Sequence, residues 1–387
     1  MVIIDFVLIL GIILIISVLS CKTTGKMGLP VLVSFILIGM LIGNWFKFED
    51  MSTVDTICNF ALLLIIFTGG FQTDFSKAKS VLPVSLALST AGTVFTAGLA
   101  GAFAYFVLRL ELYQALLLGA VISSTDAASV FSVLRSKNMN LVSNLDSVLE
   151  IESGSNDPFA YILTTVLITM ARGGSQNVLL LLLSQIVVGV LAGVVSFKLG
   201  QLLFNRLNLD IDGLYAVLLF ATAFFTYGVA VQFGGNGFLA VYLSGLILGN
   251  NKLVYKGFLS RLSSAISMLM QIMLFIVLGI LCIPTSVLAV VGSGLVFALF
   301  LFFVARPVVV FLLMKIFRHP LREIALVSWA GFRGAASIVF STLLVTAGLP
   351  YAEYVFSVVF FVCLLSVIVQ GTFISPLAKK LKLVDDE

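Results

Sequence analysis

The stretch 150–158, Glu-Ile-Glu-Ser-Gly-Ser-Asn-Asp-Pro, brings three carboxylates, two serines and an asparagine into a run of apolar residues. Ionisable side chains are costly in hydrocarbon, so such a cluster in a membrane segment indicates a functional site. On a helix Ser153 and Asp157, four residues apart, share one face. Pro158 has no amide hydrogen, so the carbonyl of Gly154 loses its helical donor and is available to an ion or water. The stretch therefore predicts a polar site inside the membrane.

Two further polar stretches interrupt apolar runs. One is Ser-Ser-Thr-Asp at 123–126, and the other is Gly-Phe-Arg-Gly at 331–334. Serine, threonine and aspartate side chains compete for backbone hydrogen bonds, and glycine weakens a helix interior. We therefore expect both helices to be interrupted at these points.

The chemistry of these residues suits a small cation and a proton. Asp126 and Asp157 are the carboxylates expected near mid-membrane, where burial and a neighbouring carboxylate both disfavour the charged form. Such a group holds either a proton or a monovalent cation. This competition couples the movement of the cation to the movement of the proton. Thr125, Ser153 and Asn156 can supply further oxygens, as can unwound carbonyls. We predict no catalytic residues and no cofactor, because K⁺, Na⁺ and H⁺ are cargo.

Arg333 needs a partner, because an unpaired guanidinium is costly in a membrane. Glu152 lies on a different helix face from Asp157 and can pair without occupying the ion site. We therefore predict a structural Glu152–Arg333 ion pair. Arg306 is a further candidate counter-charge, or it extends toward the cytoplasmic surface.

Composition fixes the class of protein. Of the 387 residues 60% are hydrophobic and 10% charged, whereas a soluble domain carries roughly 25% charge. We predict an all-α polytopic membrane protein with thirteen spans of about 20 residues each. The predicted ranges are 4–20, 29–46, 57–72, 81–108, 112–134, 147–171, 176–204, 212–232, 237–250, 262–282, 286–314, 321–347 and 351–375.

Lysine and arginine concentrate in alternate loops, including Lys77 and Lys79, Lys252 and Lys256, and the tail from Lys379. Because positive loops stay in the cytoplasm, we expect the N-terminus outside and the C-terminus inside. The interrupted ranges lie seven spans apart and so run in opposite directions. This predicts inverted repeats of spans 1–6 and 8–13, with the interrupted helices crossing at mid-membrane, a pattern of transporters.

These motifs resemble a known family. Ser124-Thr125-Asp126, the stretch 152–158 and Gly331-Phe332-Arg333-Gly334-Ala335 are similar to the three signatures of monovalent cation:proton antiporters of the NhaP-type branch. The likeness is strongest to bacterial potassium/proton antiporters of the cell-volume-regulation group, and it covers nearly the whole chain.

The resemblance implies an NhaA/NhaP-like fold in one antiporter domain, 1–387. Residues 81–171 and 286–375 would form its mobile core, and residues 1–72 and 176–282 its dimerisation region. It implies elevator-type transport by a homodimer, with Asp157 binding the ion or proton and Asp126, Thr125 and Ser153 helping to coordinate it. Asn156 in place of a second aspartate implies electroneutral exchange. The family's own glutamate–arginine pair matches Glu152 and Arg333.

Several alternatives stay open. The cation is K⁺, Na⁺ or both, and a Na⁺-selective antiporter is the main alternative; a channel without proton coupling is a weaker one. An intramembrane enzyme is not expected, since the single histidine, His319, lies in a loop. We expect an integral inner-membrane protein in contact with lipid and without a nucleic-acid partner. The sequence after Lys379 leaves open whether a cytoplasmic regulatory domain follows in the complete protein.

Overall fold

The computed structural model describes residues 2–27, 31–43, 51–136, 139–174 and 177–384. Within these residues the chain is helical, apart from loops and an isolated antiparallel bridge between Leu141 and Val384. The predicted all-α class is therefore confirmed for the described residues of the chain.

The first half of the chain contains α1 (Val2–Met27), α2 (Val31–Ile42), α3 (Met51–Gln72), α4 (Phe75–Ala78), α5 (Leu82–Ala87), the π-helical segment η1 (Leu88–Gly92), α6 (Thr93–Phe106), α7 (Leu112–Ile122), α8 (Ala127–Ser136), α9 (Leu145–Ala171) and α10 (Val178–Arg206). The second half contains α11 (Asp212–Gln232), α12 (Gly237–Gly249), α13 (Lys256–Leu281), α14 (Pro284–Ala289), α15 (Val291–Phe300), the π-helical segment η2 (Leu301–Ala305), α16 (Arg306–Ile316), α17 (Leu321–Trp329), α18 (Ala335–Thr346) and α19 (Ala352–Lys380).

Each of the thirteen predicted ranges overlaps one helix or one run of consecutive helical segments. Among the described residues, seven helices are long and apolar enough to cross a membrane by length and composition. The number of crossings stays a prediction. The predicted range 29–46 extends at both ends beyond the described residues, and the loop lysines Lys47 and Lys137 lie outside them.

Both expected interruptions are present. The helical chain stops between α7 and α8, over 123–126, and again between α17 and α18, over 330–334. The two breaks meet, since the backbone N–H of Asp126 donates to the carbonyl of Phe332 at 2.8 Å. The third polar stretch does not break its helix, because α9 continues through Pro158.

Two long helices contain π-helical segments, η1 between α5 and α6 and η2 between α15 and α16. Such segments often occur at functional sites. Pro307, the second residue after η2, removes one backbone donor from the ladder. The two segments lie in the fourth and eleventh predicted spans, seven apart like the interrupted helices. This agrees with inverted repeats, which stay a prediction.

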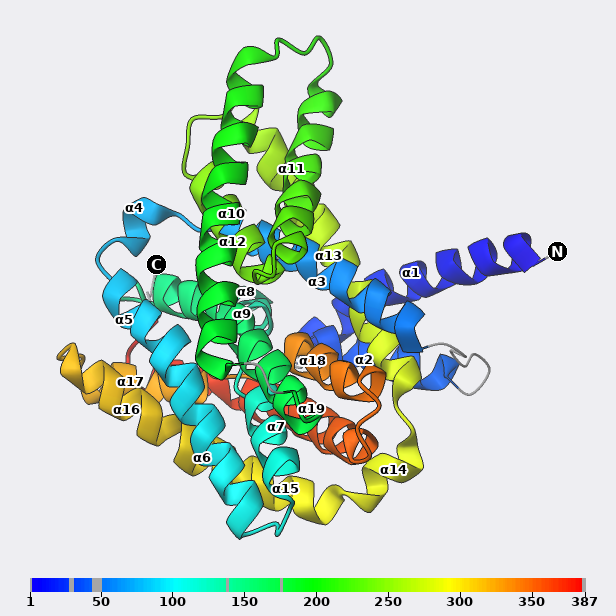
Figure 1. Ribbon diagram of the computed structural model, residues 1–387, viewed down its shortest axis with the longest axis vertical. Helices are drawn as coiled ribbons and strands as arrows, with labels where there is room; N and C mark the ends of the chain where they lie inside the picture. Colours follow the sequence, from blue (N-terminus) through cyan, green and yellow to red (C-terminus); the bar gives the residue numbers. More distant parts are fainter. Residues whose placement is uncertain (1, 28–30, 44–50, 137–138, 175–176, 385–387) are drawn as a thin grey trace.

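Glycines allow several helices to pack closely. α2 contacts α13 at Gly39 and Gly279, where a Cβ on Gly39 would lie 2.9 Å from the Cα of Gly279. Small residues allow such contacts in membranes, where helices gain little from the hydrophobic effect. Figure 1 shows α10 and α11 as a hairpin at the top of the view, α1 extending to the right, and α9, α18 and α19 below the hairpin.

Candidate functional site

A cavity of about 430 Å³ lies at the helix breaks. It is lined by residues of α2, α3 and α13 and by residues of α8, α9, α18 and the first break. Four of the five residues predicted to bind the ion line it: Thr125, Asp126, Ser153 and Asp157. Asn156 is not among its lining residues as far as the structure describes them.

Asp157 lies midway along α9 and is partly exposed toward the cavity. Its Oδ1 accepts a hydrogen bond from the hydroxyl of Ser124, a residue of the first helix break. A carboxylate has about four acceptor positions, so this bond leaves capacity for a cation or a proton. The break in the α7–α8 helix therefore holds the Asp157 side chain in place without saturating it.

Asp126 immediately precedes α8 and caps its N-terminus. Its Oδ1 accepts from the backbone N–H of Ser129 at 3.3 Å, and its Oδ2 accepts from the hydroxyl of Ser129 at 2.5 Å. This is the usual geometry of an aspartate N-cap, in which the side chain satisfies a free helix donor. Asp126 thus faces the cavity while it orders the second half of its own interrupted helix.

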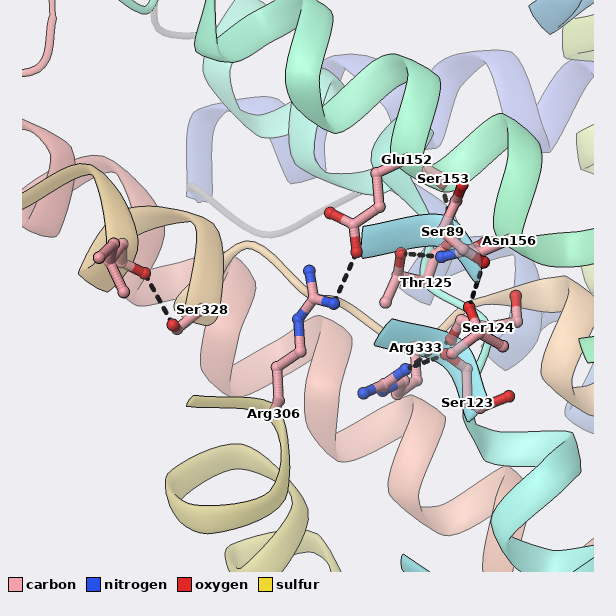
Figure 2. A network of polar contacts seen from close by, with 12 residues as sticks. Ser89, Ser123, Ser124, Thr125, Glu152, Ser153, Asn156, Arg306, Ser328 and Arg333 are labelled. Carbon is pink, nitrogen blue, oxygen red and sulfur yellow. Dashed lines mark hydrogen bonds and ion pairs between the residues drawn. The ribbon is translucent and has the colours of Figure 1, made fainter. Parts of the chain in front are cut away.

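Thr125 is held from two directions by α9. Its carbonyl oxygen accepts from the Ser153 hydroxyl at 2.6 Å, and its hydroxyl oxygen accepts from the Asn156 amide at 2.5 Å (Figure 2). Asn156 is buried behind the lining residues. In this arrangement Asn156 orients Thr125, and Ser153 fixes the unwound backbone beside Asp126.

The predicted Glu152–Arg333 ion pair is wrong. Glu152 pairs with Arg306, whose Nη1 lies 2.6 Å from the Glu152 Oε1, and both side chains are buried (Figure 2). Arg306 begins α16 where the π-helical segment η2 ends, and its side chain reaches Glu152 of α9. Arg306, expected only as a further counter-charge or a surface-directed residue, is the glutamate's partner.

Arg333 binds backbone carbonyls instead. Its Nη1 donates to the carbonyl oxygens of Ser123 and Ser124, each at 2.8 Å. These carbonyls follow the C-terminal end of α7, where free carbonyls carry partial negative charge. The helix break therefore supplies the acceptors for Nη1 of the arginine.

The glycines of the Gly331–Gly334 motif make room for the site. A Cβ on Gly331 would lie 2.6 Å from the Nε of Arg306, and a Cβ on Gly334 would collide with the carboxylate of Asp126. The motif thus serves both the buried ion pair and the cavity.

The wall formed by α3 and α13 is absent from the predicted site. It contributes Thr68 and Gln72 from α3, and Ser264, Ser267 and Gln271 from α13. Residues 264, 267 and 271 share one helix face by their spacing, which is the only signal in the sequence. Gln72 donates to the Ser264 hydroxyl at 2.6 Å, so the two helices are linked at the cavity.

Known proteins resemble this chain over nearly its whole length. The family model described as "Sodium/hydrogen exchanger, transmembrane" matches residues 11–380. The K⁺/H⁺ antiporter NhaP of Alkalimonas amylolytica is 35% identical over 97% of this chain and 67% of its own. The K⁺/H⁺ antiporter NhaP2 of Shewanella oneidensis is 34% identical over 98% of this chain and 67% of its own.

A solved structure shares the fold. The sodium proton antiporter NhaP1 of Methanocaldococcus jannaschii, determined at pH 8, superposes with a TM-score of 0.85 at 22% identity, covering 98% of this chain and 99% of that one. The resemblance to cation:proton antiporters of the NhaP type is thereby confirmed, and the chain belongs to the transmembrane sodium/hydrogen exchanger family.

Proposed function

We propose that the protein exchanges K⁺, Na⁺ or both for H⁺, with cation and proton competing for Asp157. The observation that carries this proposal is the position of Asp157 and Asp126. Both carboxylates line one cavity at the point where two interrupted helices meet. Thr125 and Ser153 line the same cavity and offer neutral oxygens.

The charges around the site support electroneutral exchange. Two guanidinium groups, Arg306 and Arg333, accompany four carboxylates, Glu152 and the cavity-lining Glu150, Asp126 and Asp157. In the proposed competition Asp157 takes up either one proton or one monovalent cation. Each of these occupants adds one positive charge to the site. Exchange of one for the other then moves no net charge across the membrane.

The position of the cavity supports an elevator-type movement. Three of its lining helices, α2, α3 and α13, belong to the proposed dimerisation region, residues 1–72 and 176–282. The other lining residues, from α8, α9, α18 and the α7–α8 break, belong to the proposed mobile core, residues 81–171 and 286–375. A site between two such regions is closed on one side and opened on the other when one region slides past the other. We propose that the protein acts in this way, as a homodimer in the inner membrane.

The first experiment uses the protein in proteoliposomes with a pH-sensitive dye inside. KCl or NaCl is added to one side, with the membrane potential clamped at zero by an ionophore for an ion other than those tested. Proton movement driven by the cation gradient would support electroneutral antiport, and the two salts would identify the cation. Cation flux without proton movement would favour a channel instead.

Asp157→Asn tests the site itself. The amide keeps the size of the side chain but cannot hold a proton and a cation in turn, so we expect cation-driven proton flux to fall to the level of empty liposomes. Asp146→Asn, on the same helix but away from the cavity lining, is the matched control and should retain wild-type flux. An Asp157→Asn variant that still exchanges would remove this residue from the mechanism.

A further inference from the structure

Thr68 on α3 is a buried residue at the wall of the cavity. Its side chain is 2% exposed, and its hydroxyl oxygen has no hydrogen-bond partner among the described residues. It belongs to the lining of the cavity that contains Asp157 and Asp126. An enclosed hydroxyl without a partner costs roughly 1–3 kcal/mol, so its persistence calls for an explanation.

Three other buried threonines in helices do not share this state. The hydroxyls of Thr93, Thr164 and Thr226 donate to the carbonyl oxygen four residues earlier, at 2.6–2.8 Å. This bond within the helix is available to threonine at any interior position. Thr68 leaves it unmade, so its oxygen, which is enclosed in this structure, keeps its acceptor positions unused.

The surroundings of Thr68 favour a small cation as that group. A Cβ built on the next residue, Gly69, meets nothing within 4 Å, so α3 borders open space here. The same cavity is lined by three carboxylates, Asp126, Glu150 and Asp157, which make it attractive to a cation. A hydroxyl oxygen is a suitable neutral ligand for a hard monovalent ion.

We propose that the Thr68 hydroxyl is a ligand of the transported cation, contributed by α3 to the cavity that Asp157 also lines. The inference rests on the proposed function and adds to it. The cation is held between two regions of the molecule, whereas a proton on Asp157 needs no oxygen from α3. Thr68 therefore affects cation binding and the preference between K⁺ and Na⁺, but not proton binding.

The test compares apparent KM values for K⁺ and Na⁺ in the same proteoliposomes. Thr68→Val removes the hydroxyl at nearly constant shape, and we expect about a tenfold rise in the apparent KM with little change in the maximal rate. We also expect the ratio of the two KM values to shift. Thr68→Ser keeps the oxygen and should remain close to wild type, and Thr68→Ala is a second variant without it.

The chain offers a matched control in Thr96 of α6. Its hydroxyl is also buried and without a partner in the described structure, but Thr96 is not among the cavity residues. Thr96→Val should leave both KM values unchanged. The inference would be overturned if Thr68→Val kept the wild-type KM values. It would also be overturned if Thr68→Val and Thr96→Val raised the apparent KM equally. If wild-type protein shows no cation-driven proton flux, the proposed function itself fails, and the two failures are thus distinguishable.

Discussion

The two buried arginines beside the cavity differ in what they contact. Arg306 forms an ion pair with Glu152, whereas Arg333 binds two backbone carbonyls. Removing one member of a buried pair leaves an uncompensated charge, which costs about 3–5 kcal/mol, while replacing both by apolar residues is often close to neutral. A double variant that removes both Glu152 and Arg306 should therefore be more stable than either single variant.

We predict that Arg306→Met and Glu152→Leu each lower the apparent Tm of the detergent-solubilised protein, and that the double variant recovers most of the loss. The physical reason is that the double change leaves no unpaired charge behind. The measurement is the fraction of protein that stays monodisperse after heating, which size-exclusion chromatography reports. Arg333→Met combined with Glu152→Leu is the comparison, and rescue by that combination instead would contradict the assigned pairing.

At the scale of elements, the two interrupted helices depend on each other. Asp126 joins the α7–α8 break to the α17–α18 break through its backbone N–H, and it also caps α8. Arg333 from the second break binds the carbonyls that follow α7. Each break thus satisfies backbone groups that the other would leave free, as unwound segments inside a membrane require.

Gly334→Ala tests this crossing. The added methyl group would occupy the space of the Asp126 carboxylate, so the two breaks must separate. We expect the apparent KM for the cation to rise at least tenfold, because Asp126 is displaced from the cavity. Gly98→Ala in α6, where an added Cβ meets nothing within 4 Å, is the control and should behave as wild type. An unaltered KM in Gly334→Ala would show that the close approach is not required for binding.

At the scale of the whole molecule, the basic loops predict how the chain sits in the membrane. The loop containing Arg206 and the loop containing Lys252 and Lys256 belong to the basic set, whereas the connection at Arg172 belongs to the other. Positive charge near the ends of spans holds a loop in the cytoplasm. The orientation that follows decides from which side an ion reaches the cavity.

Reporter fusions check this orientation. A periplasmic phosphatase fused after Gly174 should be active, and the same enzyme fused after Asn208 should be inactive. Green fluorescent protein should show the reverse at the same two positions, because it becomes fluorescent in the cytoplasm. The opposite pattern at both sites would invert the proposed topology, and equal signals at both would remove the predicted span 176–204.

The sequence by itself determined the class of protein, the helix breaks and most of the lining carboxylates. Long apolar runs predict helices because backbone groups in a membrane must be satisfied within the segment. Polar residues inside those runs stand out because their burial is costly, and this is why Asp126, Asp157 and both breaks could be located. The thirteen predicted ranges correspond to helices for the same reason.

Only the tertiary structure decided which charges meet. Charge balance alone matched Glu152 with Arg333, but the π-helical segment before Arg306 and the carbonyls after α7 produced a different set of contacts. The sequence also did not predict Thr68 or the polar face of α13 as parts of the site. Residue spacing along one helix does not tell which polar side chain of another helix lines the same cavity. Local patterns report the cost of burial along one helix, whereas pairing depends on distances between helices that are remote in the sequence.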